Sequence, residues 1–216
     1  MNDPKDDDSP HIVKTTVRRE PWEVDPRLKE LELVRKGLLT VRDVALSEAA
    51  NATPFHPANA AGTFAYHHGT WALRDQFVGP KSNWVEDRAD GIEAIRNDAL
   101  KIKIAFSNVD LACDDHQLPK PRSRKGAGAE RASGGLFPDL AHYAPRMTGE
   151  YALYYLMVDE DGAAELTRPV LRGGTFIAAV ERIYLSFGGD DGGGSALLED
   201  DSTGPAERFD PQVARK

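Results

Sequence analysis

The chain has 216 residues, of which 40% are hydrophobic and 8% aromatic, values typical of a globular protein with a buried core. Its formal net charge is -8 at pH 7, which disfavours indiscriminate binding to nucleic acid and limits any such contact to a local basic surface. Cys113 is the single cysteine, which excludes an intrachain disulfide and a cysteine-based zinc cluster. The acidic first residues do not resemble a signal peptide, and no apolar run approaches the ~20 residues of a membrane span. We therefore expect a soluble, cytoplasmic protein with no membrane partner.

Composition divides the chain into three parts. Residues 1–25 are polar and interrupted by prolines, which predicts a disordered N-terminal arm in which only 12–17 has the composition of an edge strand. Residues 188–216 begin with a glycine-rich run and carry seven acidic residues against three basic ones, which predicts a disordered acidic tail. The segment 26–187 between them is predicted to form a single α+β domain.

Apolar residues at helical spacing predict three helices in the first half of this domain. The first covers 27–36, begins after a proline and ends at Gly37. The second begins with Thr40 as its N-cap. The third covers 63–78, although Gly69 disfavours it by ~1 kcal/mol relative to alanine. The apolar residues of the third helix are expected to lie against a sheet: Tyr66, Trp71, Leu73 and Phe77.

Two shorter elements are predicted in the middle of the domain. Ile92, Ile95 and Ala99 share helical spacing, so we expect a short helix there. Residues 101–107 alternate between polar and apolar side chains, which predicts a strand with one buried face and with its lysines on the other face.

The last segments predict the sheet. Residues 151–158 and 163–171 flank the turn dipeptide Asp161-Gly162 and predict a β-hairpin. Residues 175–187 fit both a helix and a strand, and we expect a turn over 175–180 followed by a strand over 181–187. Together these elements predict an α+β fold in which N-terminal helices cover an antiparallel sheet of about four strands.

The segment 119–131 is the first candidate site because it concentrates positive charge in an acidic protein. It holds five basic residues and one acidic residue among prolines and glycines, which predicts an exposed loop. Closely spaced cations beside a glycine backbone suit the binding of phosphate oxygens. The alternative is that the segment has no ligand and is a solvated loop or contacts the acidic tail. The residues predicted to bind a polyanion are Lys120, Arg122, Arg124, Lys125 and Arg131, together with Arg74 on the third helix.

The third helix provides the second candidate site. His67 and Arg74 lie seven residues apart on one face, so a histidine there could act as a general base or hold an anion beside the arginine. We select His67, His68 and the strand-end Asp110 as candidate catalytic residues, with ordinary surface or packing positions for the histidines as the alternative.

Other chemical motifs are missing from the sequence. The acids from Asp110 to Asp115 lack the partner pattern of a two-carboxylate nuclease and suit turn solvation, and the histidines lack metal-chelating spacing. Cys113 is expected to be a small buried side chain. There is no Walker A loop and no dinucleotide-binding glycine motif, so no metal is predicted and no cofactor is identified.

Three functions follow from these observations. The preferred one is a non-enzymatic binding or regulatory protein that contacts nucleic acid or another polyanion through the 120–131 loop. The second is a small hydrolase or phosphodiesterase with a His/Arg/Asp cleft. The third is a protein-interaction module with acidic tails.

Overall fold

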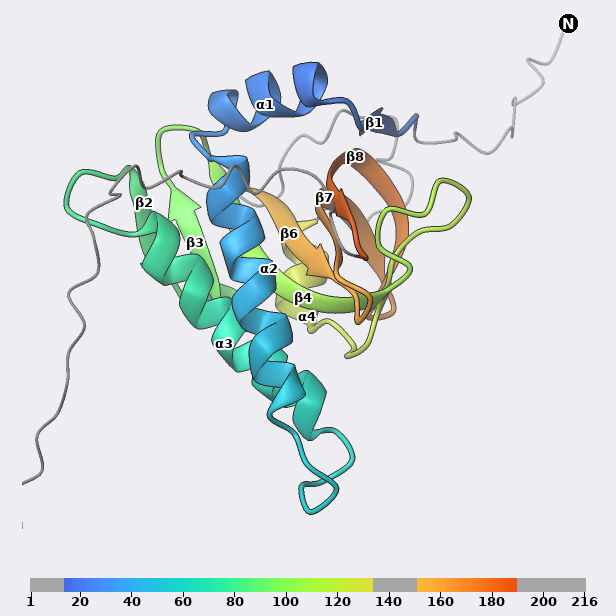
Figure 1. The fold of residues 1–216 in the computed structure, drawn as a ribbon. Helices are drawn as coiled ribbons and strands as arrows, with labels where there is room; N and C mark the ends of the chain where they lie inside the picture. The colour runs from blue at the N-terminus through green and yellow to red at the C-terminus, as the bar shows by residue number, and fades with distance from the viewer. Residues whose placement is uncertain (1–13, 134–150, 190–216) are drawn as a thin grey trace, which may run out of the picture.

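The computed structural model describes residues 14–133 and 151–189 (Figure 1). The predicted arm and tail fall largely outside these residues, although 14–25 form the first strand and the start of the first helix. The described elements are β1 (Thr16–Arg18), α1 (Pro21–Glu30), α2 (Arg35–Ala50), α3 (Ala60–Phe77), β2 (Trp84–Asp87), the short helical turn η1 (Ala89–Gly91), β3 (Ala94–Asn97), β4 (Ile102–Asp110), β5 (Lys120–Pro121), α4 (Ala127–Ala132), β6 (Ala152–Val158), β7 (Ala163–Arg172) and β8 (Thr175–Phe187). None of the described helices is long and apolar enough to cross a membrane.

The strands form one mixed sheet of eight strands in the order β1-β8-β7-β6-β4-β3-β2, with β5 paired to β4 at its side. The pairs β4–β6 and β1–β8 are parallel, and the other neighbours are antiparallel. The α+β class is therefore correct, but the predicted antiparallel sheet of about four strands is wrong.

The sheet was underestimated because several of its strands are too short to show a pattern in sequence. β2 and β3 have four residues each, and β3 occupies the segment predicted to be a short helix at 92–99. Ala94 and Ile95 are both buried because both faces of the sheet are covered there, so the residues do not alternate. Pairing with β4, rather than local preference, makes this segment a strand.

The hairpin over 151–171 is confirmed by the antiparallel pair β6–β7. The strand that follows differs from its prediction, because β8 spans the whole of 175–187 without a turn over 175–180. Its pairing with β7 contains three register shifts, beside Glu165, Pro169 and Leu171. Such irregularities change which side chains face the core, and this explains why the apolar residues of β8 fit the spacing of a helix as well as that of a strand.

The helices lie close to their predicted places but have different ends. α1 contains Pro26 and ends before Glu32, a residue with φ 54°, while Gly37 lies inside α2 and terminates no helix. Thr40 is also inside α2, where its hydroxyl donates to the Lys36 carbonyl at 2.9 Å, so it is not an N-cap. Figure 1 shows α2 and α3 side by side across one face of the sheet, with their connecting loop projecting beyond its edge.

α3 confirms the third predicted helix but turns one aromatic residue outward. Leu73 and Phe77 are buried, whereas Trp71 is 57% exposed and does not pack against the sheet. Gly69, unfavourable for an isolated helix, is required by packing: a Cβ at this position would lie 2.7 Å from the Phe106 ring. The close approach of α3 to β4 therefore outweighs the helix propensity lost at Gly69.

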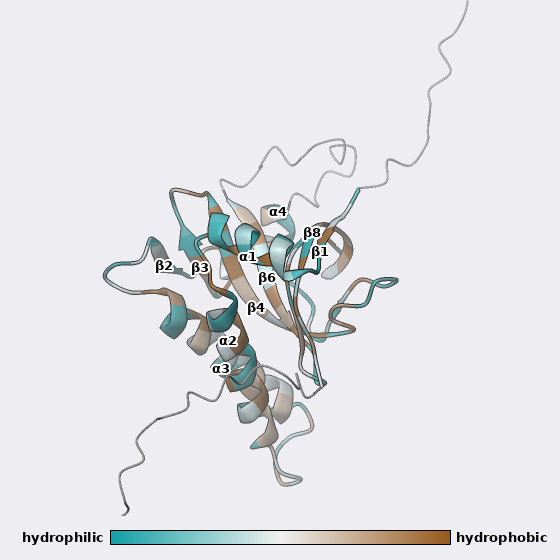
Figure 2. Cartoon of the chain, turned by 45° about the horizontal axis from the view of Figure 1, so that its top comes forward, coloured by the Kyte–Doolittle hydropathy of each residue, from teal (hydrophilic) through white to brown (hydrophobic). Residues whose placement is uncertain are grey.

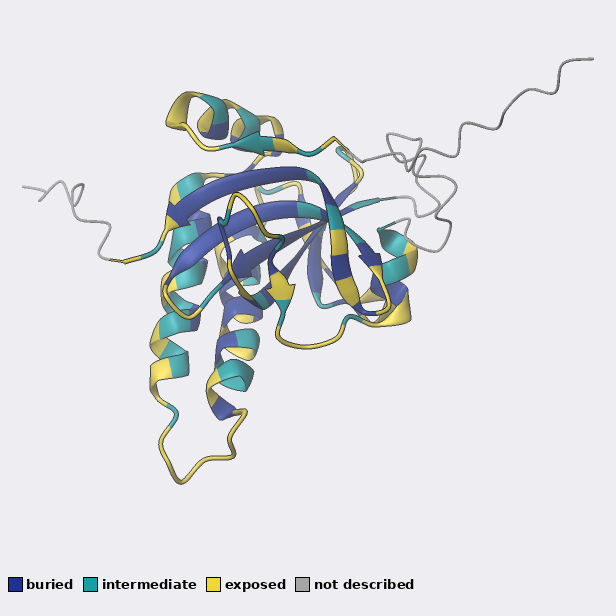
Figure 3. Ribbon diagram, turned by 90° about the vertical axis from the view of Figure 1, so that its right-hand side faces the viewer, coloured by how far each residue is buried: buried dark blue, intermediate teal, exposed yellow. Residues whose placement is uncertain are grey.

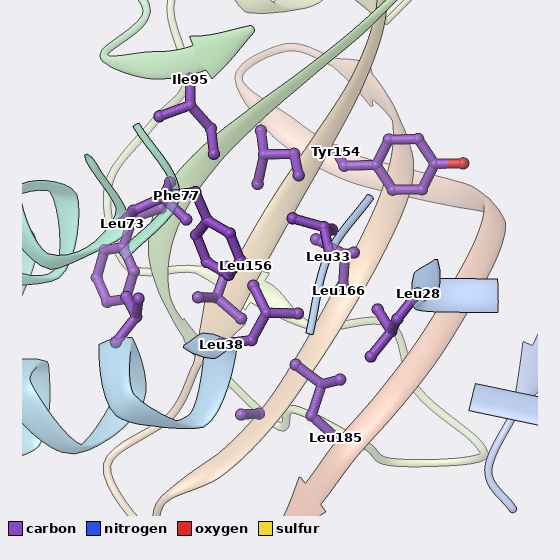
Figure 4. Packing of buried hydrophobic residues seen from close by; sticks show 14 of the residues in the cluster. Leu28, Leu33, Leu38, Leu73, Phe77, Ile95, Tyr154, Leu156, Leu166 and Leu185 are labelled. Atoms are coloured by element: carbon purple, nitrogen blue, oxygen red, sulfur yellow. The ribbon is translucent and has the colours of Figure 1, made fainter. Parts of the chain in front are cut away.

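Each face of the sheet has its own apolar cluster. The first lies beneath α1, α2 and α3, where Leu38, Leu73 and Phe77 meet Leu156 and Leu166 of the sheet (Figure 4). The second lies on the opposite face, where Ala129 of α4 packs with Tyr155, Met157 and other strand residues. Figure 3 shows the central strands buried along most of their length, and Figure 2 shows β4 and β6 as largely apolar beside a more hydrophilic α1.

The second face also holds buried charges, which corrects the expectation of a solvated lysine face on the 101–107 strand. Lys103 is 7% exposed and its Nζ lies 2.7 Å from Oδ2 of the buried Asp87. Further along the sheet, the Arg182 Nη2 donates to Glu165 Oε2 at 2.6 Å, and the Glu165 residue has no exposed surface. A sheet covered on both sides can carry charges only when they are paired in this way.

Candidate anion-binding site

Lys125 is the basic residue of the 120–131 loop whose side chain contacts the sheet. Its backbone N–H donates to the Gly174 carbonyl in the β7–β8 turn at 3.0 Å, which ties the 120–131 loop to the sheet. Its side-chain Nζ donates to Ser107 Oγ on β4 at 2.7 Å and lies 5.1 Å from the centre of the Tyr155 ring on β6. The amine therefore points inward over the second face of the sheet.

Burial sets the protonation of this amine. Desolvation lowers the pKa of Lys125 to about 8, because a charged ammonium is less stable away from water. Among residues 14–133 and 151–189, no acidic side chain forms an ion pair with Lys125. At neutral pH the site thus contains a mostly protonated amine with a hydroxyl and an aromatic face as its neighbours.

A small pocket opens beside Lys125. It has a volume of about 140 Å³ and its lining includes Arg124, Tyr66, Tyr155, Asp90 and Glu93. Burial raises the pKa values of both tyrosines, so both hydroxyls stay protonated and can donate hydrogen bonds.

The two acids of this lining are engaged by arginines. Arg74 forms an ion pair with Glu93 at 2.5 Å, and the Arg88 Nε lies 3.7 Å from the same carboxylate. Asp90 faces Arg131 more loosely, at 3.9 Å. Arg74 and Arg131, both selected as polyanion-binding residues, thus lie around the pocket but compensate acids of the protein itself.

The remaining bases of the loop differ sharply in their availability. The Arg122 guanidinium contacts Asp110 and Glu160, each at 2.7 Å, so its charge is already compensated. Arg124 is exposed and forms no hydrogen bond or ion pair with any described residue. Lys120 is an exposed residue of the short strand β5. The loop therefore presents Arg124 and Lys120 outward and Lys125 inward.

A turn distant in sequence contacts the basic loop. Gly174 has φ 78°, and a Cβ there would lie 3.2 Å from the Arg124 Cβ, so the turn needs glycine for both its conformation and its contact with the loop. The inward contacts of Lys125 with Ser107 and Tyr155 could not be found from sequence, because they arise from strand pairing far along the chain.

The proposed catalytic residues do not gather around Lys125. His67 and His68 are exposed on α3, His68 lies 3.7 Å from Glu48 of α2, and neither histidine lines the Lys125 pocket. Asp110 lines a separate hollow with Cys113 and the acids after β6. Cys113 itself is buried, and burial together with the nearby Glu165 raises the pKa of its thiol far above the usual range, as expected for an inert side chain.

The arrangement suits binding better than catalysis. The Lys125–Ser107 hydrogen bond joins a base to a hydroxyl, but Ser107 is fully buried and does not line the pocket, so a substrate there would meet the amine first. Within the described part of the chain, no group of three or more metal-binding side chains is present. A protonated amine with tyrosine hydroxyls beside it is a receptor for one anionic group.

Comparisons of the chain with protein-family models, curated proteins and solved structures find no match. We therefore infer the function of the chain from its own geometry.

Proposed function

We propose that the chain is a non-enzymatic binding protein that contacts nucleic acid, or another polyanion, through the 120–131 loop. The observation that carries this proposal is the inward amine of Lys125, at a pocket whose lining also includes Arg124; neither side chain forms an ion pair with any described residue. Burying a cation without a carboxylate partner costs stability, so such a cation is favoured where an anionic ligand supplies the missing charge. In the cytoplasm, the location that we expect, the protein would meet nucleic acid and other polyanions.

The surrounding charges restrict the contact to this surface. The whole chain is acidic, with a net charge of -8, so a polyanion is repelled from most of it. Arg124 and Lys120 are exposed cations of the same loop and can follow a phosphate backbone, whereas Arg122 is held by two acids. Binding should consequently be weak, local and dependent on salt.

The matched pair Arg124→Gln and Arg122→Gln tests this proposal. Both changes remove one positive charge from the same loop, but Arg122 is paired with two acids whereas Arg124 has no ion-pair partner among the described residues. We expect Arg124→Gln to weaken binding of single-stranded DNA and to reduce the slope of log K against log salt by about 0.7, the value for one lost phosphate contact. Arg122→Gln should leave that slope unchanged.

Fluorescence anisotropy of a labelled oligonucleotide over a salt series measures both quantities, with circular dichroism as the control for folding. Equal effects of the two substitutions would show that binding follows net charge alone. Wild-type protein that binds no oligonucleotide or heparin at low salt would overturn the proposal.

A further inference from the structure

We infer that the Lys125 pocket receives a terminal phosphate of the nucleic acid, a phosphomonoester at a strand end, while Arg124 contacts the adjoining backbone. This inference rests on the proposed function and specifies what that site recognises. It follows from the shape of the pocket, from the hydrogen bonds still available in it and from the charges around it.

The shape favours a group that projects from the end of a chain. The pocket volume of about 140 Å³ is close to that of a cavity of roughly 150 Å³ that admits one benzene molecule. A single phosphate group, with one phosphorus and four oxygens, can therefore fit. A terminal phosphate is attached through only one ester bond, whereas an internal phosphodiester is bulkier because it carries a nucleoside on each side.

The donors in the pocket are also suited to several oxygens on one phosphorus. An ammonium group has three N–H donors, and Lys125 uses one of them on Ser107, which leaves two for a ligand. The Tyr155 hydroxyl forms no hydrogen bond with any described residue and belongs to the same lining. Three donors around one small space match the three free oxygens of a phosphomonoester.

The charges favour the same ligand. Asp90 and Glu93 line the pocket, but Arg131, Arg74 and Arg88 lie beside them, so Lys125 and Arg124 leave the surroundings positive. A phosphomonoester carries a second negative charge above pH about 6, which an internal diester never acquires. The Lys125 ammonium therefore discriminates in favour of the strand end.

The test compares one oligonucleotide in three forms, with a 5′-phosphate, with a 3′-phosphate and with hydroxyls at both ends. We expect a terminal phosphate on at least one end to tighten binding to the wild-type protein about tenfold or more, as for a charge-assisted hydrogen bond. Lys125→Gln and Lys125→Arg should abolish or strongly reduce this gain. Arg124→Gln should weaken all three forms by a similar factor, and the exposed Lys81→Gln serves as the control.

The outcomes separate this inference from the proposed function. If all three forms bind equally and Arg124→Gln still weakens them, end recognition is wrong and the binding function stands. If no form binds, both fail. AMP that binds through Lys125, without any gain from a terminal phosphate on the oligonucleotide, would also overturn the inference and identify a free-nucleotide site instead.

Discussion

Arg182→Met should lower the free energy of unfolding by about 3–5 kcal/mol, because it leaves a charged carboxylate unpaired in the core. Glu165 has no exposed surface and receives two hydrogen bonds from the Arg182 guanidinium, at 3.0 and 2.6 Å. The Cys113 N–H and the Thr167 hydroxyl also donate to it, at 2.7 and 2.6 Å, but they carry no compensating charge. Chemical denaturation of wild type and variant measures the difference.

Two further variants make this prediction specific. Adding Glu165→Gln to Arg182→Met removes the unpaired carboxylate charge, so the double variant should recover a large part of the lost free energy of unfolding. Arg88→Met, which removes a 66% exposed arginine paired with Glu86, should cost less than about 1 kcal/mol. A loss below about 1 kcal/mol for Arg182→Met itself would mean that Glu165 is solvated or protonated, and that the buried pair does not organise the second face.

Lys125→Met should have the opposite effect on stability while it removes binding. The lysine is half-buried and has no acidic partner among the described residues, and its pKa of about 8 lies below the ordinary 10.5, so folding at pH 7 includes a cost for the charged amine. An apolar side chain of similar length avoids that cost, and we expect the free energy of unfolding to rise by about 1–3 kcal/mol at pH 7. Ser107 loses one contact but keeps the Asn108 carbonyl at 3.2 Å.

The size of this effect depends on pH. Between about 8 and 10.5 the amine is neutral in the folded chain and protonated in the unfolded chain, so rising pH stabilises the wild type. The advantage of Lys125→Met should therefore shrink across this window, as measured by denaturation at pH 7 and at pH 10. Destabilisation of the variant at pH 7 would show that Lys125 is a structural residue rather than a binding residue.

The parts of the fold that were predictable are those with long, regular patterns. The β6–β7 hairpin has two apolar runs around Asp161-Gly162, and α3 has apolar residues at helical spacing over five turns, so local chemistry determines both. β2 and β3 are too short for a pattern, and nothing local specifies the parallel pairing of β4 with β6 across the intervening loop and helix. Lys103, which the alternation in sequence places in solvent, is instead buried beside Asp87 of β2 and the Tyr151 ring.

The candidate site, like the fold, has a part that was predictable from the sequence and a part that was not. Composition identified the 120–131 loop as a cluster of cations. It could not distinguish Arg122, which forms ion pairs with Asp110 and Glu160, from Arg124, which forms none with the described residues. It also could not show that Lys125 turns inward onto Ser107, since the two residues lie on different elements. The availability of a charge is a property of tertiary contacts, whereas its presence is a property of the sequence.

The most direct measurement of the central claim is the titration of the Lys125 amine by NMR in protein with labelled lysines, assigned by comparison with Lys125→Arg. In the free protein we expect Lys125 to titrate with a pKa of about 8, below the ordinary lysine value of 10.5. Saturation with the 5′- or 3′-phosphorylated oligonucleotide should raise this pKa, because a bound phosphate stabilises the ammonium. A Lys125 amine that titrates at the ordinary value near 10.5, or one whose pKa neither phosphorylated strand changes, would contradict an anion-binding role for this pocket.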